Sequence, residues 1–232
     1  MLINSTVNRN VIKKIAVALG DLNKQVVYVG GAVISLYIND PAAEDVRPTK
    51  DIDISLAITT LGELESLRQQ LSKKGFIQNA EENVMCRFDY DGIKVDVMST
   101  KAIGWAPANP WFEPGFHFKQ VVDVDGQKIQ ILPLSYFLAS KLEAFNDRGS
   151  KDPRTSQDFE DIVYILDNRK DIVDDMFKYS DDEVKQYLRR EFIEIQKDKL
   201  KQEAIMSNLS YENRDIRFQQ IIDKLNLITD AL

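Results

Sequence analysis

The sequence is poor in the side chains that build zinc sites and hydrolytic triads. Its 232 residues include one histidine, His117, and one cysteine, Cys86. These two residues cannot assemble a zinc site of the usual ligand set. A hydrolytic triad would have to use His117. This residue lies in an aromatic, proline-containing stretch, which favours a loop or packing histidine. A single cysteine forms no internal disulfide, which predicts a cytoplasmic location.

Long apolar runs are also lacking. No stretch approaches the length that crosses a bilayer, and residues 1–5 do not begin a secretory signal, so we expect no membrane partner. The formal net charge of −7 argues against a protein that coats nucleic acid non-specifically. A local basic groove for one RNA end stays compatible with that charge.

Carboxylates, in contrast, are abundant. Aspartate and glutamate together number 37. Any bound metal is therefore expected to be a hard, oxygen-ligated cation such as magnesium, manganese or calcium. Hydrophobic residues make up 44% of the chain, which predicts a packed interior.

The first half of the chain alternates predicted helices and strands. Apolar residues repeat at helical spacing in residues 12–19 and 61–71, and a helix is expected at residues 33–37, directly after Gly30-Gly31. The strand patterns occupy residues 25–29, 51–58, 84–90, 93–98, 121–124 and 128–132. The last four form two hairpins, because Asp91-Gly92 and Asp125-Gly126 favour two-residue turns.

After Pro133 the pattern becomes wholly helical. Ser180 and Glu183 predict a capping box at the start of a helix that continues to residue 204. The expected fold class is therefore α/β (α+β), with a mixed β-sheet core and flanking helices, followed by a C-terminal helical domain. We predict an α/β domain over residues 1–132 and a helical domain over residues 133–232.

The paired glycines and the strand that follows carry the strongest chemical pattern. Gly30 and Gly31 end a strand, which lets the backbone approach a ligand, and a helix beginning there would offer N–H groups to phosphate. Asp51 and Asp53 are two apart on a strand, so both carboxylates project from one face. Such neighbours repel each other unless a cation lies between them, which predicts a divalent metal site.

Asp96 is the candidate third ligand. On the strand over residues 93–98, Val95 and Val97 face one side and Asp96 the other. If this strand lies beside the strand of Asp51 and Asp53, three carboxylates converge and two metal ions can be held between them. Alternatively, the glycine pair is an ordinary turn and Asp96 a solvent-facing hairpin residue.

The order of these motifs resembles the DNA polymerase β nucleotidyltransferase superfamily. The spelling Arg47-x-Thr49-x-Asp51-x-Asp53 looks like its AbiEii/AbiGii toxin-like branch, which tolerates the long separation between Gly31 and Asp51. That branch also carries two helical motifs that are matched here by Lys141-Leu142-Glu143-Ala144-Phe145-Asn146-Asp147-Arg148 and by Asp158-Phe159-Glu160-Asp161. The resemblance extends from about residue 26 to residue 166.

The resemblance implies transfer of a nucleoside monophosphate from a nucleoside triphosphate to an acceptor hydroxyl, with Mg2+ or Mn2+ as cofactor. It implies that the metal ligands are Asp51, Asp53 and Asp96. The catalytic residues would be these three with Lys141 and Asp161. The implied nucleotide-binding residues are Gly30, Gly31, Arg47, Thr49, Lys141, Arg148 and Asp158. Asp158 and Asp161 could instead position Lys141 or Arg148, contact the acceptor, or form structural salt bridges.

Three functions follow from this resemblance. The first is a toxin-like enzyme of a bacterial toxin–antitoxin or phage-defence system, which modifies an RNA acceptor such as tRNA and is silenced by an antitoxin protein. The second is a nucleotidyltransferase for an aminoglycoside or lincosamide antibiotic. The third is a nucleotide-binding protein that has lost catalysis, although retention of three carboxylates argues against it.

Overall fold

The computed structural model describes residues 3–49, 51–78, 86–149 and 151–231. The chain forms two compact units, and each is described by itself. The first unit contains Met1–Ser35 and Glu44–Leu132, and the second contains Leu36–Ala43 and Pro133–Leu232. Within the described residues, no helix is both long enough and apolar enough to span a membrane.

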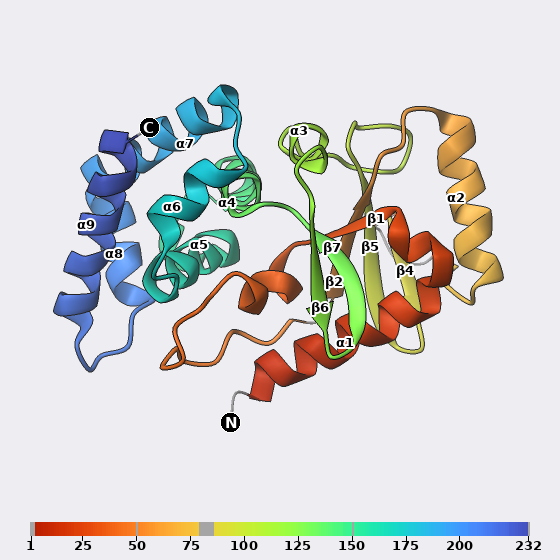
Figure 1. The fold of residues 1–232 in the computed structure, drawn as a ribbon, viewed down its shortest axis with the longest axis horizontal. Helices are drawn as coiled ribbons and strands as arrows, with labels where there is room; N and C mark the ends of the chain where they lie inside the picture. Colours follow the sequence, from red (N-terminus) through yellow and green to blue (C-terminus); the bar gives the residue numbers. More distant parts are fainter. Residues whose placement is uncertain (1–2, 50, 79–85, 150, 232) are drawn as a thin grey trace. The chain divides into compact units, whose positions relative to one another are not determined.

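The first unit is built on a mixed seven-stranded sheet (Figure 1), in the order β3-β4-β5-β2-β1-β7-β6. β2 pairs in parallel with β5 and antiparallel with β1, which in turn pairs in parallel with β7. The strands are β1 Val26–Val29, β2 Asp51–Leu56, β3 Ile77–Gln78, β4 Arg87–Tyr90, β5 Ile93–Ser99, β6 Gln120–Val124 and β7 Gln127–Ile131. The predicted mixed sheet with flanking helices is confirmed.

Both predicted hairpins are present, and their turns explain their register. Asp91 and Gly92 have φ values of 50° and 75°, and Asp125 and Gly126 have φ values of 53° and 85°. Positive φ at both central residues is the requirement of a type I′ turn, which aspartate and glycine meet at low cost. Residues 84 and 85, the first two of the strand predicted at residues 84–90, lie outside the described residues.

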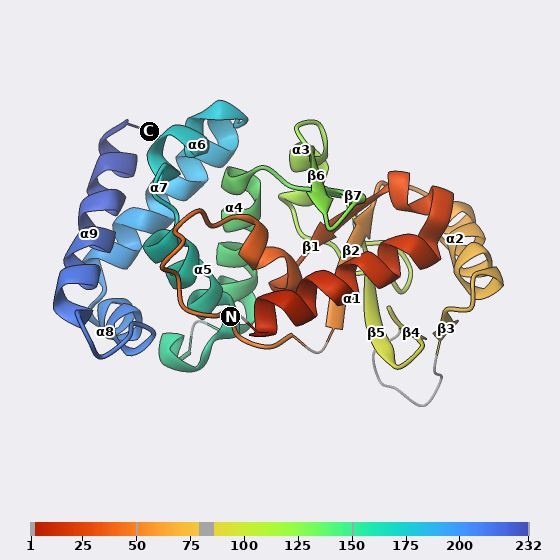
Figure 2. The same ribbon diagram turned by 60° about the horizontal axis from the view of Figure 1, so that its bottom comes forward.

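Within the described residues, the α-helices of the first unit are α1 Ile3–Leu19, α2 Leu61–Lys73 and α3 Phe112–Phe116. Arg9 of α1 pairs with Asp125 in the β6–β7 turn, and Lys14 pairs with Asp91 in the β4–β5 turn. α1 therefore runs across the sheet past both hairpin turns (Figure 2). α2 begins with a capping box between Thr60 and Glu63.

The second unit is helical. Its α-helices are α4 Leu134–Ala144, α5 Gln157–Asn168, α6 Ile172–Lys178, α7 Asp182–Lys197, α8 Lys199–Ser207 and α9 Arg214–Ala231. The segment Leu36–Ala43 packs with them, because Tyr37 stacks on Phe137 at 4.3 Å between ring centroids. The backbone N–H groups of Asn39 and Asp40 also donate to the Asn168 carbonyl oxygen.

Local capping corrects the prediction of one helix over residues 180–204. The N-cap of α7 is Asp181, whose side chain accepts from the Val184 backbone N–H, so Ser180 forms no capping box. Ser180 instead donates its hydroxyl to the Met176 carbonyl. Asp198 then ends α7 and caps α8, because its side chain accepts hydrogen bonds from the backbone N–H groups of Leu200 and Lys201. Aspartate at a helix N-terminus favours a new start over continuation.

Candidate active site

The parallel pairing of β2 with β5 places the predicted metal ligands on one face of the sheet. Asp53 is the register partner of Asp96, and Asp51 lies two residues before Asp53. Side chains of register partners and of alternate strand residues project from the same face. Asp51, Asp53 and Asp96, which we call the carboxylate cluster, therefore share that face. The condition on which Asp96 was a candidate ligand, that its strand lies beside the strand of Asp51 and Asp53, is met.

The opposite face of the same strands explains why this arrangement is fixed. Ile52 and Ile54 of β2 and Val95 and Val97 of β5 are buried, with at most 2% of their surface exposed. A register slip of one residue would turn these apolar side chains toward the polar face and the aspartates into the core. The alternation of apolar and acidic residues thus specifies where the carboxylates lie.

Arg87 is a residue of this site that the sequence analysis missed. It lies on β4 as the register partner of Asp96. Its Nε donates to Asp96 Oδ1 at 2.7 Å and its Nη2 to Asp96 Oδ2 at 2.6 Å, while Nη2 also lies 3.3 Å from Asp51 Oδ2. The two-residue turn at Asp91-Gly92 would have identified this pair, because it fixes every partner along the hairpin.

The glycine turn lies against the carboxylate cluster. Gly30 has a φ of +72°, and a Cβ at this position would lie 1.8 Å from Asp53 Oδ2. A side chain at residue 30 would therefore be strained by the backbone conformation and would displace the carboxylate. Gly30 follows Val29, the register partner of Asp53 on β1, so the turn and the carboxylate occupy adjoining space.

Gly31 lies similarly close to side chains of the loop before β2. A Cβ at Gly31 would lie 2.4 Å from Arg47 Nη2 and 3.3 Å from Thr49 Oγ1. The Thr49 hydroxyl is buried and has no hydrogen-bond partner within the described residues. We call Gly30, Gly31, Arg47 and Thr49 the glycine cradle. It combines backbone without side chains, a guanidinium and an unsatisfied hydroxyl, which together suit an anionic ligand.

The segment after the cradle differs from the predicted helix. Gly31–Leu36 is a six-residue 3-10 helix. Because such a helix is short and has poorer hydrogen-bond geometry than an α-helix, the expected contribution of a helix N-terminus to phosphate binding loses its support. The cradle side chains and the backbone of the turn remain as the candidate phosphate ligands.

The donor chemistry of the carboxylate cluster fits a divalent cation. Its ligands are hard oxygens from adjacent strands, and Arg87 already supplies one positive charge to two of the three carboxylates. In the parts of the chain that the structure describes, no group of three or more acidic, histidine or cysteine side chains has a metal-binding arrangement. The aspartates thus have the required chemistry, but two of them are engaged by a guanidinium.

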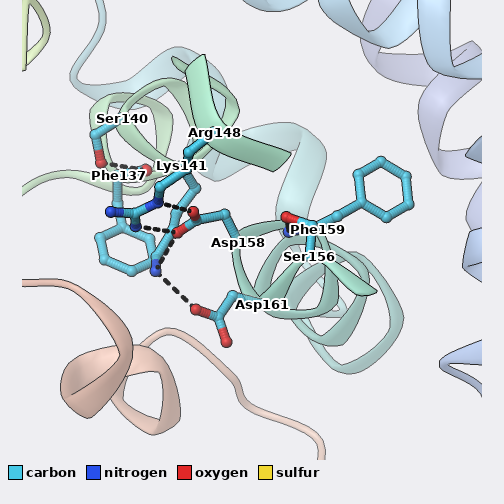
Figure 3. A network of polar contacts seen from close by, with 8 residues as sticks. All are labelled: Phe137, Ser140, Lys141, Arg148, Ser156, Asp158, Phe159 and Asp161. Atoms are coloured by element: carbon cyan, nitrogen blue, oxygen red, sulfur yellow. Dashed lines mark hydrogen bonds and ion pairs between the residues drawn. The ribbon is translucent and has the colours of Figure 1, made fainter. Parts of the chain in front are cut away.

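The other predicted residues form a network inside the second unit (Figure 3). Lys141 of α4 donates to Asp158 Oδ1 at 3.1 Å and to Asp161 Oδ2 at 2.7 Å, both on α5. Arg148, from the π-helical turn Phe145–Gly149, donates Nε to Asp158 Oδ2 at 2.8 Å and Nη2 to Oδ1 at 3.1 Å. The structure therefore brings together all four residues predicted in the C-terminal half.

Burial within this network is uneven. Lys141, Asp158 and Asp161 are buried, whereas 68% of the Arg148 side chain is exposed. Burial alone raises the pKa of Asp158, but the charges and hydrogen bonds of Lys141 and Arg148 outweigh it, and the net pKa is lowered. Asp158 is thus held as a carboxylate between a buried ammonium and an exposed guanidinium.

Comparison with known proteins decides the family. Residues 16–231 match the model of the nucleotidyl transferase AbiEii toxin, Type IV TA system. The chain belongs to the AbiEii nucleotidyltransferase toxin family. The resemblance drawn from the sequence motifs is confirmed, and the protein is a nucleotidyltransferase.

Two solved structures are similar to this AbiEii-family chain. An antigenic nucleotidyltransferase-like protein from Paracoccidioides brasiliensis has a TM-score of 0.50 and 18% identity, covering 86% of this chain and 92% of that one. The antibiotic-resistance factor ANT(2'')-Ia has a TM-score of 0.46 and 13% identity, covering 70% of this chain and 84% of that one. At 18% identity the first shows the fold alone. No curated protein matches the sequence.

Replacing Gly30 with alanine should destabilise the protein. The positive φ and the clash with Asp53 Oδ2 predict a loss of at least about 1 kcal/mol in the free energy of unfolding, measured by urea denaturation. Gly62→Ala is the matched control, because a Cβ there meets nothing within 4 Å in helix α2. It should leave stability unchanged or raise it by up to about 1 kcal/mol. Equal stability of the two variants would contradict the assigned turn geometry.

Replacing Lys141 with methionine should remove the buried ammonium that contacts Asp161 Oδ2 and Asp158 Oδ1. Asp158 would keep its contact with Arg148. We expect the free energy of unfolding at pH 7 to fall by about 3–5 kcal/mol. Because the folded pKa of Asp158 is lowered, its contribution is present above its unfolded pKa of about 4 and is lost as pH falls through the folded value. The difference from wild type should therefore shrink below about pH 4.

The matched control for this measurement is Arg154→Met, which removes an exposed pair with Asp152. It should cost less than about 1 kcal/mol at either pH. A Lys141→Met penalty as small as that of the control, or one that grows at acid pH, would show that the network does not hold Asp158 as a buried carboxylate.

Proposed function

We propose that this nucleotidyltransferase moves a nucleoside monophosphate from a nucleoside triphosphate to a hydroxyl of an RNA acceptor, such as tRNA. In this step the acceptor oxygen bonds to the α-phosphorus, the α–β phosphoanhydride bond breaks and pyrophosphate leaves. The observation that carries the proposal is the β2–β5 register, which aligns Asp53 with Asp96 beside the glycine turn.

The carboxylate cluster would hold the divalent ions, Mg2+ or Mn2+. When bound, they supply positive charge to the phosphates and lower the pKa of the attacking hydroxyl. Asp51 and Asp53 are the proposed ligands on the nucleotide side. Asp96 is proposed to bind on the acceptor side and to help draw the proton from the acceptor hydroxyl. Carboxylates from two adjacent strands of a sheet give this arrangement a rigid support.

The glycine cradle is the proposed triphosphate site. Gly30 and Gly31 leave the backbone open to a phosphate, and a side chain at either position would collide with Asp53 or Arg47. The Arg47 guanidinium can donate two parallel hydrogen bonds to phosphate oxygens, and the buried Thr49 hydroxyl can add another. Each of these groups favours an anion, which supports a phosphate-binding role.

Lys141 and Asp161 are proposed as further catalytic residues, with Asp158 and Arg148 as nucleotide-binding residues. Two carboxylates fix the Lys141 ammonium, and Asp158 orients the exposed Arg148 guanidinium by a bidentate contact. Orientation by a carboxylate is the usual way in which a long basic side chain is held for recognition of phosphate. This geometry supports the assignment made from the sequence.

The biological role follows from the family. A toxin of a type IV toxin–antitoxin system acts on its own cell, so we propose an antitoxin protein encoded with this chain as its partner. The proposal of an RNA acceptor is separate from that of the antitoxin and can be tested on the purified enzyme.

The test uses purified protein with each α-labelled nucleoside triphosphate, Mg2+ or Mn2+, and separate fractions of total RNA, total protein and an antibiotic panel. We expect label in the RNA fraction and its loss on chelation of the metal. Asp53→Asn should reduce labelling by about 100-fold or more, because it removes a metal ligand. The control Asp123→Asn changes an aspartate of the β6–β7 hairpin outside the site and should label normally.

Other distributions of label have defined meanings. Label in the antibiotic fraction alone would replace RNA with a small-molecule acceptor. Label in no fraction, or labelling by Asp53→Asn equal to that of the wild type, would contradict a metal-dependent transferase centred on the carboxylate cluster.

A further inference from the structure

The carboxylate cluster already contains a positive charge. Arg87 donates to both oxygens of Asp96 at 2.6 and 2.7 Å and reaches Asp51 at 3.3 Å. The pair is well shielded, with 21% of the Arg87 side chain and 12% of the Asp96 side chain exposed. A bidentate, charge-assisted contact with this little exposure is among the stronger polar contacts a protein makes.

The register explains why a cation is needed at this position. Asp53 and Asp96 are partners on neighbouring strands, whose backbones lie roughly 5 Å apart. Asp51 adds a third carboxylate on the same face. Partial burial makes their mutual repulsion stronger than in water, because the surrounding dielectric is lower. The Arg87 guanidinium relieves part of this repulsion.

We propose that Arg87 is a resident counter-cation that competes with the divalent metal for Asp96 and Asp51. This inference rests on the proposed metal-binding function of the carboxylate cluster. A guanidinium bonded to both oxygens of Asp96 uses lone pairs that a metal also requires. Mg2+ needs ligands at about 2.0–2.1 Å in near-octahedral geometry, so a cation on the same oxygens obstructs and repels it.

Competition of this kind has two consequences. Without metal, Arg87 holds the carboxylates of β2 and β5 in position, so the site is assembled in advance. Metal entry must then displace the guanidinium from Asp96, which weakens the affinity of the cluster for the ion. The residue therefore sets metal affinity, which is distinct from serving as a ligand or contacting the substrate.

The experiment measures Mn2+ binding to the full-length protein by isothermal calorimetry, without nucleotide. Arg87→Met removes the charge and keeps a side chain of similar reach. We expect it to bind Mn2+ about tenfold tighter than the wild type, because one repelling positive charge is gone. The double variant Arg87→Met/Asp96→Asn should lose this gain, since the released carboxylate is absent.

Two further variants sharpen the comparison. Arg68→Met removes a bidentate pair with Glu65 on the surface of α2 and should leave Mn2+ affinity unchanged. Arg87→Lys keeps the charge as a single point and loses the bidentate geometry, so its affinity should lie between those of the wild type and Arg87→Met. If Arg87→Met fails to fold without metal, the Arg87→Lys comparison decides the question.

Thermal unfolding gives an independent measure of the same competition. Added Mn2+ should raise the melting temperature of Arg87→Met more than that of the wild type, because ligand stabilisation grows with affinity. Mn2+ binding by folded Arg87→Met that equals or is weaker than wild-type binding would overturn the inference, and the transferase proposal would stand. Failure of wild type and all variants to bind Mn2+, together with absence of label transfer, would overturn both.

Discussion

Repulsion between carboxylates on adjacent strands is the constraint on which the first unit depends. The buried apolar residues on β2 and β5 fix the register that brings Asp53 beside Asp96. A shift of either strand by one residue would expose those apolar side chains, so the charges cannot be separated in that way. The structure resolves the conflict with Arg87 from β4, whose own register is set by the turn of the same hairpin. Apolar packing on one face of the sheet thus brings carboxylates together on the other face, where a cation is needed to offset their repulsion.

The glycine turn and the carboxylate cluster constrain each other. Asp53 needs the space that a side chain at residue 30 would fill, and the turn needs the positive φ that glycine adopts at low cost. At the next residue, the absence of a side chain on Gly31 lets the Arg47 guanidinium lie against the backbone. An anion bound at this turn would therefore meet backbone, guanidinium and hydroxyl groups directly, next to the carboxylates that would hold its counter-ions.

Local sequence patterns predicted the individual strands and turns of this site better than they predicted how those strands pair. Alternation with a period of two identified the strand of Asp51 and Asp53, and the turn at Asp91-Gly92 identified the β4–β5 hairpin. The parallel pairing of β2 with β5 joins segments about forty residues apart, and no local propensity encodes such a contact. Arg87 was within reach of sequence reasoning, because the turn that fixes the hairpin also fixes its partner. The 3-10 geometry after Gly31 and the break at Asp198 were missed, because the apolar spacing alone favoured longer helices.

The network around Lys141 also points beyond stability. Taking an ammonium and two carboxylates out of water is expensive, and apolar residues of similar volume often stabilise a core at least as well as a buried ion pair does. The Phe137 ring, whose centroid lies 6.0 Å from Lys141 Nζ, is fully buried, so an apolar alternative would fit its surroundings. A chain selected for stability alone would gain little by keeping these charges. The presence of these charges, with Arg148 linking Asp158 to the solvent, supports the proposed role of the network in binding charged ligands.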